Sequence, residues 1–271
     1  MFRCSIIAFI IFLLGFIKIK AQPVFNAVGG YANGQAGISV TQSNVFSVQN
    51  NQATLAKLQQ HQIAIYNSIP FAISNLATSN LSTAAHFKHF NAGLAFSQFG
   101  YNLFSQQRAT AAMAKKLSDM FSLGIGFSYL ATNIAEQPTV HNFIGETGVL
   151  FEPKNGWHFG LYVFNPTMVK YGNGLSDKIP SLVRAGVGYD VGKDLTLNAE
   201  YEKILSTDDN LRASLQYKLN SNVGLMCGWA SKPAKIGFGS NIIYKNWEFI
   251  FAGNVHQVLG LTPSLTIAYK K

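Results

Sequence analysis

The sequence predicts an all-β protein, a transmembrane antiparallel β-barrel of about 14 strands with an N-terminal hatch segment in its lumen. Three observations support this fold class. Charged residues make up only 12% of the 271-residue chain, although its mean hydropathy is just +0.14. Apolar residues alternate with small or polar ones in segment after segment, and the connectors between these segments alternate in length. A soluble domain carries roughly 25% charged residues, so the usual solvated surface is missing.

The N-terminus has the layout of a secretory signal peptide, which we place at residues 1–21. It begins with the basic Arg3, continues with an apolar stretch over residues 6–16, and ends on the small residue Ala21. The apolar stretch is shorter than the roughly 20 residues of a spanning helix, and a retained membrane anchor is the alternative. After cleavage, Cys227 is the single cysteine, so no internal disulfide forms.

Residues 22–58 fit no spanning pattern and are rich in Gly, Asn, Gln and Ser. They form either a disordered leader or a small hatch that folds inside the lumen. A barrel of about 14 strands has an interior too wide for its own side chains to fill. We therefore favour a periplasmic or luminal hatch over residues 22–58.

Residues 59–271 are predicted to form the barrel. In residues 120–131, Phe121, Leu123 and Ile125 alternate with Ser122 and tiny residues. Alternation with a period of two is typical of a two-sided strand. The segments with this pattern are 60–68, 81–87, 91–98, 107–117, 120–131, 141–151, 156–164, 180–191, 194–203, 210–219, 221–229, 235–244, 246–253 and 261–270.

The connectors between these segments alternate between short and long. The long ones are predicted near 69–80, 99–106, 132–140, 165–179, 204–209, 230–234 and 254–260. Outer-membrane barrels have short periplasmic turns and longer outer loops. With an even number of strands, this order predicts that both termini lie in the periplasm of a Gram-negative bacterium.

The apolar face of each predicted strand is expected to meet lipid. No water reaches backbone groups there, so the sheet closes on itself. Aromatic residues near the segment ends are predicted to form girdles at the two membrane interfaces; they are Phe121, Tyr129, Trp157, Tyr189, Tyr201, Trp229, Tyr244, Trp247 and Tyr269.

One group of charged residues is predicted to face the lumen. The alternation points the side chains of Arg184, Glu200, Glu202, Arg212 and Lys218 inward from three consecutive strands. Opposite charges on adjacent strands pair across a sheet. This ladder is either structural, joining the barrel wall to the hatch because luminal charges must be paired or hydrated, or a lining that selects the solute.

The sequence carries no pattern that predicts an enzyme. It has no G-x-S-x-G, H-E-x-x-H or phosphate-binding loop. His86 and His89 have a metal-like spacing, but a strand points them to opposite faces, and we interpret them as interfacial histidines. We predict no catalytic activity, no metal and no cofactor.

The formal net charge is +9, yet the sequence contains no basic cluster or nucleic-acid motif. Export also argues against nucleic acid as a partner. We expect the basic residues of the barrel rim to meet outer-membrane lipid headgroups or lipopolysaccharide instead.

The order of glycines in the predicted hatch, Gly29-Gly30, Gly34 and Gly37-Ile38-Ser39-Val40, followed by about 14 alternating segments, resembles the FadL superfamily of outer-membrane barrels. It is most similar to the PorV/PorQ-like branch of the Bacteroidetes. The family's hatch carries an Asn-Pro-Ala-Gly-Leu-like segment. The matching stretch here begins at Asn51 and lacks that proline and glycine.

This resemblance implies one of two functions. A PorV-like barrel serves as a partner in the type IX secretion system or a related outer-membrane complex, where it docks other proteins. A FadL-like barrel takes up small hydrophobic solutes. The longest predicted outer loop is 165–179, and its Met168, Val169 and Leu175 are too few for a capture groove. We therefore expect the docking role, with transport as the alternative.

Overall fold

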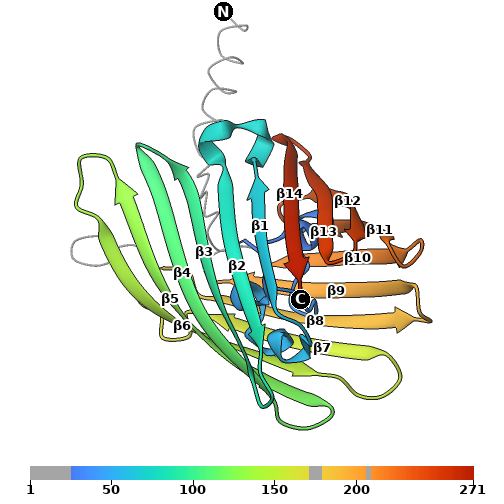
Figure 1. Ribbon diagram of the computed structural model, residues 1–271. Coiled ribbons are helices and arrows are strands. Elements are labelled where there is room, and N and C mark those ends of the chain that lie inside the picture. The colour runs from blue at the N-terminus through green and yellow to red at the C-terminus, as the bar shows by residue number, and fades with distance from the viewer. Residues whose placement is uncertain (1–25, 171–178, 206–208) are drawn as a thin grey trace, which may run out of the picture.

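The computed structural model describes residues 26–170, 179–205 and 209–271 (Figure 1). Within these ranges the chain forms one closed antiparallel barrel of 14 strands, so the predicted fold class is confirmed. Each strand pairs with its neighbours in sequence, and β1 pairs with β14 to close the wall. The predicted signal peptide, residues 1–21, lies outside the described residues.

The strands follow the alternating segments closely. Their bounds are β1 Gln62–Ser68, β2 Thr78–His86, β3 Asn91–Tyr101, β4 Phe104–Lys116, β5 Phe121–Ile134, β6 Val140–Phe151, β7 Trp157–Phe164, β8 Leu182–Val191, β9 Leu195–Ile204, β10 Asn210–Lys218, β11 Val223–Ala230, β12 Lys235–Tyr244, β13 Trp247–His256 and β14 Gly260–Lys270.

The alternation sorts side chains between the outside and the lumen. On β5, Phe127 is 70% exposed, whereas its neighbour Ser128 is 1% exposed. Large apolar side chains lie on the outside of every strand from β1 to β14. Exposed apolar surface of this extent marks a contact with membrane or protein, and on a closed barrel it is the face that meets lipid. No helix in the described ranges has the length and apolarity needed to cross a membrane.

The two ends of the barrel differ in their connections. We call the end where β1 begins and β14 ends the turn end, and the opposite end the loop end. The loop end has two long connections, residues 69–77 and 165–181; the first contains the short helices η3 (Pro70–Ala72) and η4 (Ser74–Leu76).

The predicted alternation of connector length is only partly present. We expected a long connector near 99–106, but β3 and β4 continue until only residues 102–103 join them. Gly100 has a φ of +99°, and this conformation lets β3 bend into the tight connection. A glycine before Tyr101 and Asn102 has the composition of a loop, which is why the prediction ended the strand too early.

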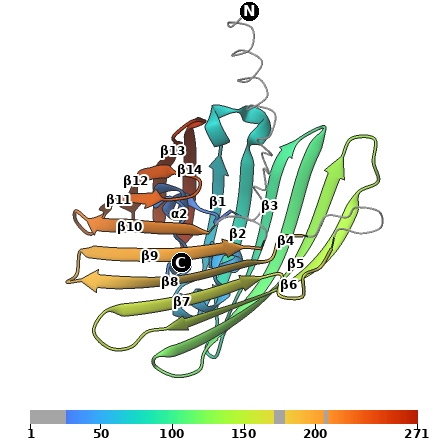
Figure 2. The ribbon, with the colours of Figure 1, turned by 180° about the vertical axis from the view of Figure 1, so that it is seen from behind.

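Residues 26–58, which we call the N-terminal segment, lie inside the barrel (Figures 1 and 2). The segment contains three short helices, α2 (Gly30–Gly34), α3 (Ser47–Asn50) and η2 (Gln52–Lys57). These helices contact the luminal faces of β4, β5 and β6 and of β11, β12 and β13. One apolar core forms between this segment and alanines of the surrounding strands, with Phe46, Val48 and Leu55 at its centre.

Candidate functional site

Four of the five residues of the predicted polar ladder meet in the lumen. The register places Arg184 opposite Glu202 and Arg212 opposite Glu200. Arg184 Nε lies 2.6 Å from Glu202 Oε2, and Arg212 Nη1 lies 2.8 Å from Glu200 Oε1. Arg212 Nη2 also pairs with Glu202. All four side chains are buried, so their charges are neutralised by one another.

Lys218, the fifth residue of the predicted ladder, forms no ion pair with these four side chains. It is the last residue of β10, at the turn end, and its side chain is exposed. Arg212 lies six positions earlier on the same strand, about 20 Å away for an extended chain. The alternation of the sequence indicates which face of the strand Lys218 lies on, but it gives no information about its position along the barrel axis.

A second buried ion pair, which sequence analysis missed, lies beside the first group. Arg108 Nη2 is 2.5 Å from Glu146 Oε1, and Arg108 Nε donates to Ser128 Oγ at 3.0 Å. Tyr162 donates its hydroxyl to Glu146 Oε2 at 2.8 Å, and the Arg184 guanidinium lies 5.8 Å from the Tyr162 ring. Tyr162 thus connects the two groups.

We call the connected side chains the ion belt. Its members are Arg108, Glu146, Tyr162, Arg184, Glu200, Glu202 and Arg212, and each is at most 6% exposed. They extend from β4 to β10, and removing one partner from such a network leaves an uncompensated buried charge.

The ion belt also holds the N-terminal segment. Glu200 Oε2 accepts hydrogen bonds from the backbone N–H groups of Ser39 at 2.8 Å and Val40 at 2.9 Å. Arg212 Nη1 donates to the carbonyl of Gly37 at 2.9 Å. On the other side of the belt, Gln52 Nε2 donates to Glu146 Oε2 at 2.8 Å. Each half of the belt therefore contacts the segment directly.

The four glycines predicted for the hatch lie where the segment is tightly packed. A Cβ on Gly29 would sit 2.6 Å from the Phe46 ring, and one on Gly30 would sit 2.8 Å from Ile250. Gly29 has a φ of +105°, a conformation that favours glycine. A side chain at either position would therefore displace its neighbour.

Gly34 and Gly37 face the neighbouring strands β11 and β10. A Cβ on Gly34 would lie 2.7 Å from Met226 Sδ, and one on Gly37 would lie 3.1 Å from the Arg212 guanidinium. Gly37 also has a positive φ of +100°. Gly30, Gly34 and Gly37 thus allow the backbone to approach the barrel wall closely, whereas Gly29 packs within the segment.

Asn51, the fifth predicted hatch residue, is fully buried and organises the turn before η2. Its Nδ2 donates to the Val40 carbonyl at 2.6 Å, and its Oδ1 accepts from Ala53 N at 3.1 Å. Gly148 of β6 faces it, and a Cβ there would lie 1.9 Å from Asn51 Oδ1. This close approach needs no proline or glycine within residues 51–56.

An apolar group fills the lumen on the loop-end side of the ion belt. We call it the loop-end cluster. Its members are Phe99, Leu130, Ile144, Phe164, Ile179 and Leu182, all at most 3% exposed. Leu130, Ile144, Phe164 and Leu182 each lie two residues from a side chain that contacts or belongs to the belt, on the same face of the strand and nearer the loop end.

The two ends of connection 165–181 are tied together beside this cluster. Asn165, fully buried, donates through Nδ2 to the Ile179 carbonyl at 2.9 Å and accepts from Val169 N at 2.9 Å. Ser181 Oγ donates to the Asn165 carbonyl at 2.7 Å. These bonds hold Ile179 against the loop-end cluster. Of the predicted capture-groove residues, Met168 is half exposed, and Leu175 lies outside the described residues.

The lumen at the turn end is polar instead. A cavity of about 340 Å³ lies there, lined by Tyr31, Thr41, His158, Asn198, Lys218 and Glu248 among others. Tyr31 donates its hydroxyl to Glu248 Oε1 at 2.6 Å. Burial and the nearby Glu248 carboxylate raise the pKa of Tyr31 well above its usual value, so the phenol stays protonated as a donor.

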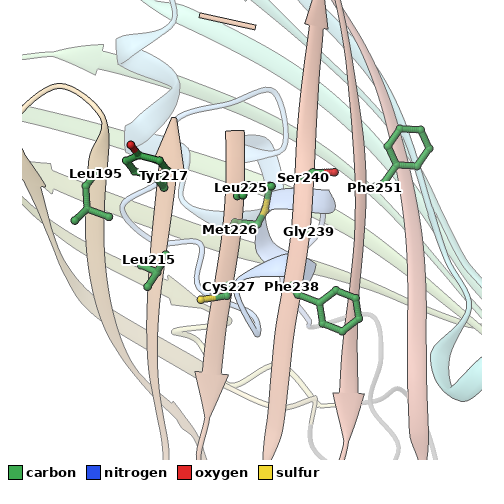
Figure 3. Close-up of a pocket in the computed structure, with 10 residues that line it drawn as sticks. All are labelled: Leu195, Leu215, Tyr217, Leu225, Met226, Cys227, Phe238, Gly239, Ser240 and Phe251. Carbon is green, nitrogen blue, oxygen red and sulfur yellow. The ribbon is translucent and has the colours of Figure 1, made fainter. Parts of the chain in front are cut away.

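A larger depression of about 670 Å³ lies on the wall formed by β9 to β13 (Figure 3). Its lining combines the small side chains of Cys227 and Ser240 with the larger ones of Leu215, Phe238 and Phe251. Most of its lining belongs to the outward, apolar face of the barrel. This groove is therefore a part of the surface that we assign to lipid.

Solved structures share this fold. The toluene transporter TbuX of Ralstonia pickettii aligns with a TM-score of 0.70 at 11% identity, covering 91% of this chain and 98% of that one. The monoaromatic hydrocarbon channel CymD aligns at 0.69 and 12%, covering 93% and 98%. A FadL homologue of Pseudomonas aeruginosa aligns at 0.60 and 12%, covering 90% and 97%.

No protein-family model and no curated protein sequence matches the chain. The structural comparisons show that the chain has the FadL-like fold, and this part of the predicted resemblance is confirmed. They give no support to the PorV/PorQ-like branch, to a Bacteroidetes source, or to the docking role in type IX secretion. The neighbours named above are transporters and channels for hydrophobic solutes, or a FadL homologue.

Proposed function

We propose that this protein is an outer-membrane channel for small hydrophobic solutes in a Gram-negative bacterium. The observation that carries the proposal is the loop-end cluster. Porins of the general type have a polar, water-filled lumen, whereas Phe99, Leu130, Ile144 and Phe164 make this part of the lumen apolar. The fold shared with toluene and monoaromatic hydrocarbon transporters supports the same reading.

The contrast between the loop-end cluster and the ion belt defines what the lumen accepts. An apolar solute gains favourable burial among the cluster side chains. The adjacent belt has its charges paired, and separating them would leave buried charges unpaired. The solute therefore binds on the loop-end side of the belt, and its passage requires a rearrangement of the N-terminal segment or of the wall.

Binding and uptake of toluene test this proposal. The purified protein in detergent is titrated with toluene by calorimetry, and radiolabelled toluene uptake is measured in a Gram-negative host that lacks its own hydrocarbon channels. Ile144→Ser places a hydroxyl in the loop-end cluster. We expect it to weaken toluene binding by about tenfold, the effect of losing one well-buried aliphatic contact.

Ile250→Ser is the matched control. Ile250 is also 1% exposed, but it faces Gly30 of the N-terminal segment outside the loop-end cluster. It should lower the stability of the barrel and leave toluene affinity unchanged. Equal loss of affinity in both variants, or no toluene binding by the wild type, would contradict the proposed function.

A further inference from the structure

The exposed lysines of the barrel are concentrated at the turn end. Six of them project from turns, an outward strand end or the C-terminus there: Lys88, Lys115, Lys154, Lys193, Lys245 and Lys271. We call these six residues the lysine ring. Four of the six turns at this end contribute a member, and Lys115 lies at the end of β4 beside a fifth turn; the turn between β10 and β11 has no member. The ring therefore surrounds nearly the whole circumference of the barrel.

The members of the lysine ring have no carboxylate partner among the described residues. Other lysines at the same end are different. Lys57 pairs with Glu152, Lys116 with Asp119 and Lys270 with Glu248. The carboxylates in these ion pairs therefore neutralise lysines outside the ring, and the ring keeps its positive charge.

The loop end has no comparable ring in the described ranges. Its connections contribute Lys170 and Lys232 as exposed lysines, while Lys203 pairs with Asp209. This asymmetry separates two ends that are built from the same strands. It indicates a partner with negative charge at one end only.

Aromatic side chains lie on the outer wall next to the lysine ring, on the side toward the middle of the barrel. The ring centroids of Trp157 and Tyr189 lie 4.6 Å apart in a tilted arrangement, and those of Trp247 and Tyr269 lie 5.0 Å apart. Lys245 Nζ is 5.5 Å from the centroid of the Tyr244 ring. Tyrosine and tryptophan mark the headgroup level of a bilayer. The next layer toward water holds the lipid phosphates, and the lysine ring is at that level.

We infer that the lysine ring is a binding surface for anionic glycerophospholipids, whose phosphates it contacts around the turn end. Lysine is suited to this partner because its flexible ammonium group reaches a phosphate without fixed geometry. The lipid leaflet at the turn end is then a glycerophospholipid leaflet. This inference does not depend on the proposed transport of hydrophobic solutes.

Lipid selectivity of the full-length protein tests the inference. The protein is reconstituted in phosphatidylcholine vesicles with a trace of spin-labelled phosphatidylglycerol or spin-labelled phosphatidylcholine. The immobilised fraction of each label gives their relative association. We expect phosphatidylglycerol to be favoured about fivefold, the preference that one lysine near an anionic surface supplies, and this preference should nearly vanish in 1 M NaCl.

The triple variant K88Q/K193Q/K245Q is expected to reduce the preference to about twofold or less. K170Q/K232Q, which removes exposed charges from the loop end, should leave it unchanged. All five residues are exposed, so the barrel should remain folded. Sodium phosphate should act no more strongly than NaCl of equal ionic strength, because the partner is a lipid and not free phosphate.

Three results would overturn the inference. They are equal association of both labels with the wild type, an equal loss of preference in the two multiple variants, and a specific displacement of phosphatidylglycerol by inorganic phosphate. The wild-type measurement alone decides the first of these, even if a variant fails to fold.

Discussion

The N-terminal segment is held by two parts of the wall in two different ways. On β9 and β10 it meets charges: Glu200 accepts the backbone N–H groups of Ser39 and Val40, and Arg212 donates to Gly37. On β11 and β12 it meets the Met226 side chain and, at two glycines, the backbone of the strands themselves. There, Gly228 and Gly237 let the backbone of residues 34–36 lie directly against the strands.

The difference shows that a segment inside the lumen is held either by directional hydrogen bonds or by close packing of its backbone. Hydrogen bonds to a carboxylate depend on the position of two donors and fail when the acceptor is lost. Close packing against glycine depends on the absence of a Cβ and fails when one is added. The two contacts therefore need opposite substitutions. Removing a carboxylate tests the charged contact, and adding a methyl group tests the glycine contact.

Glu200→Gln should have the largest effect, because it breaks the charged contact. The variant leaves Arg212 with one fewer negative partner inside the lumen and weakens the bonds to Ser39 and Val40. We expect a loss of about 3–5 kcal/mol in the free energy of unfolding, measured by urea titration of the protein in lipid vesicles. Glu136→Gln, at an exposed loop position, should change it by less than about 0.5 kcal/mol. Similar values for both variants would show that the charged contact contributes little.

Gly228→Ala should have the next largest effect, because it overfills the glycine contact. The new methyl group would lie 2.5 Å from the carbonyl carbon of Gln35, which is backbone and cannot rotate away. We expect a loss of about 1–3 kcal/mol and faster cleavage of the N-terminal segment by added protease. Gly145→Ala is the control, since its methyl group would meet nothing within 4 Å. Unchanged protease resistance in Gly228→Ala would mean that the segment does not depend on this contact.

Glu152→Gln should have the smallest effect and sharpens the comparison at a third contact. Lys57 Nζ lies 2.5 Å from Glu152 Oε1 in the turn between β6 and β7, at the rim of the barrel. We expect this partly exposed pair to contribute less than about 1 kcal/mol to stability at neutral pH. The measurement is the difference in unfolding free energy between the wild type and the variant from pH 7 to pH 3.

The sign of the pH dependence follows from the pKa of Glu152. Burial acts to raise this pKa, but hydrogen bonds from His158 and Lys57 outweigh burial and lower it below the ordinary 4.5. The contribution is therefore complete above about pH 4.5 and is lost as the pH falls through the lowered pKa. Asp119→Asn, which removes a fully exposed carboxylate, should show no such trend. A wild-type advantage that persists at pH 3 would contradict this assignment.

The strands could be predicted because each of them separates lipid from lumen, and that separation imposes a period of two on the sequence. The positions of Arg184, Glu200, Glu202 and Arg212 follow from the same period, since their partners lie on adjacent strands. The Arg108–Glu146 pair could not be found in this way. Arg108 lies on β4 and Glu146 on β6, and they pair across Ser128 of the intervening strand.

The contacts of the N-terminal segment were also beyond sequence reasoning. Residues 22–58 have no periodic pattern, so no rule assigns their residues to one strand or another. Only the glycines indicate where the segment approaches the wall, and they do not identify the residues that make the contact. Gly124, Gly148, Gly228 and Gly237 on the wall indicate room for a close approach, but they do not identify Gln52, Asn51, Gln35 and Ala36 as the residues that use it.

The closure of β1 on β14 has a consequence for biogenesis. Gln62 lies opposite Lys270, so the first and last strands of the wall join only after β14 has been synthesised. Until then, both strands present unpaired edges, which promote aggregation, and contacts between such distant positions form slowly. A polypeptide that lacks β1 or β14 would therefore keep an open edge on the strand that remains, since these two strands are neighbours in the described wall.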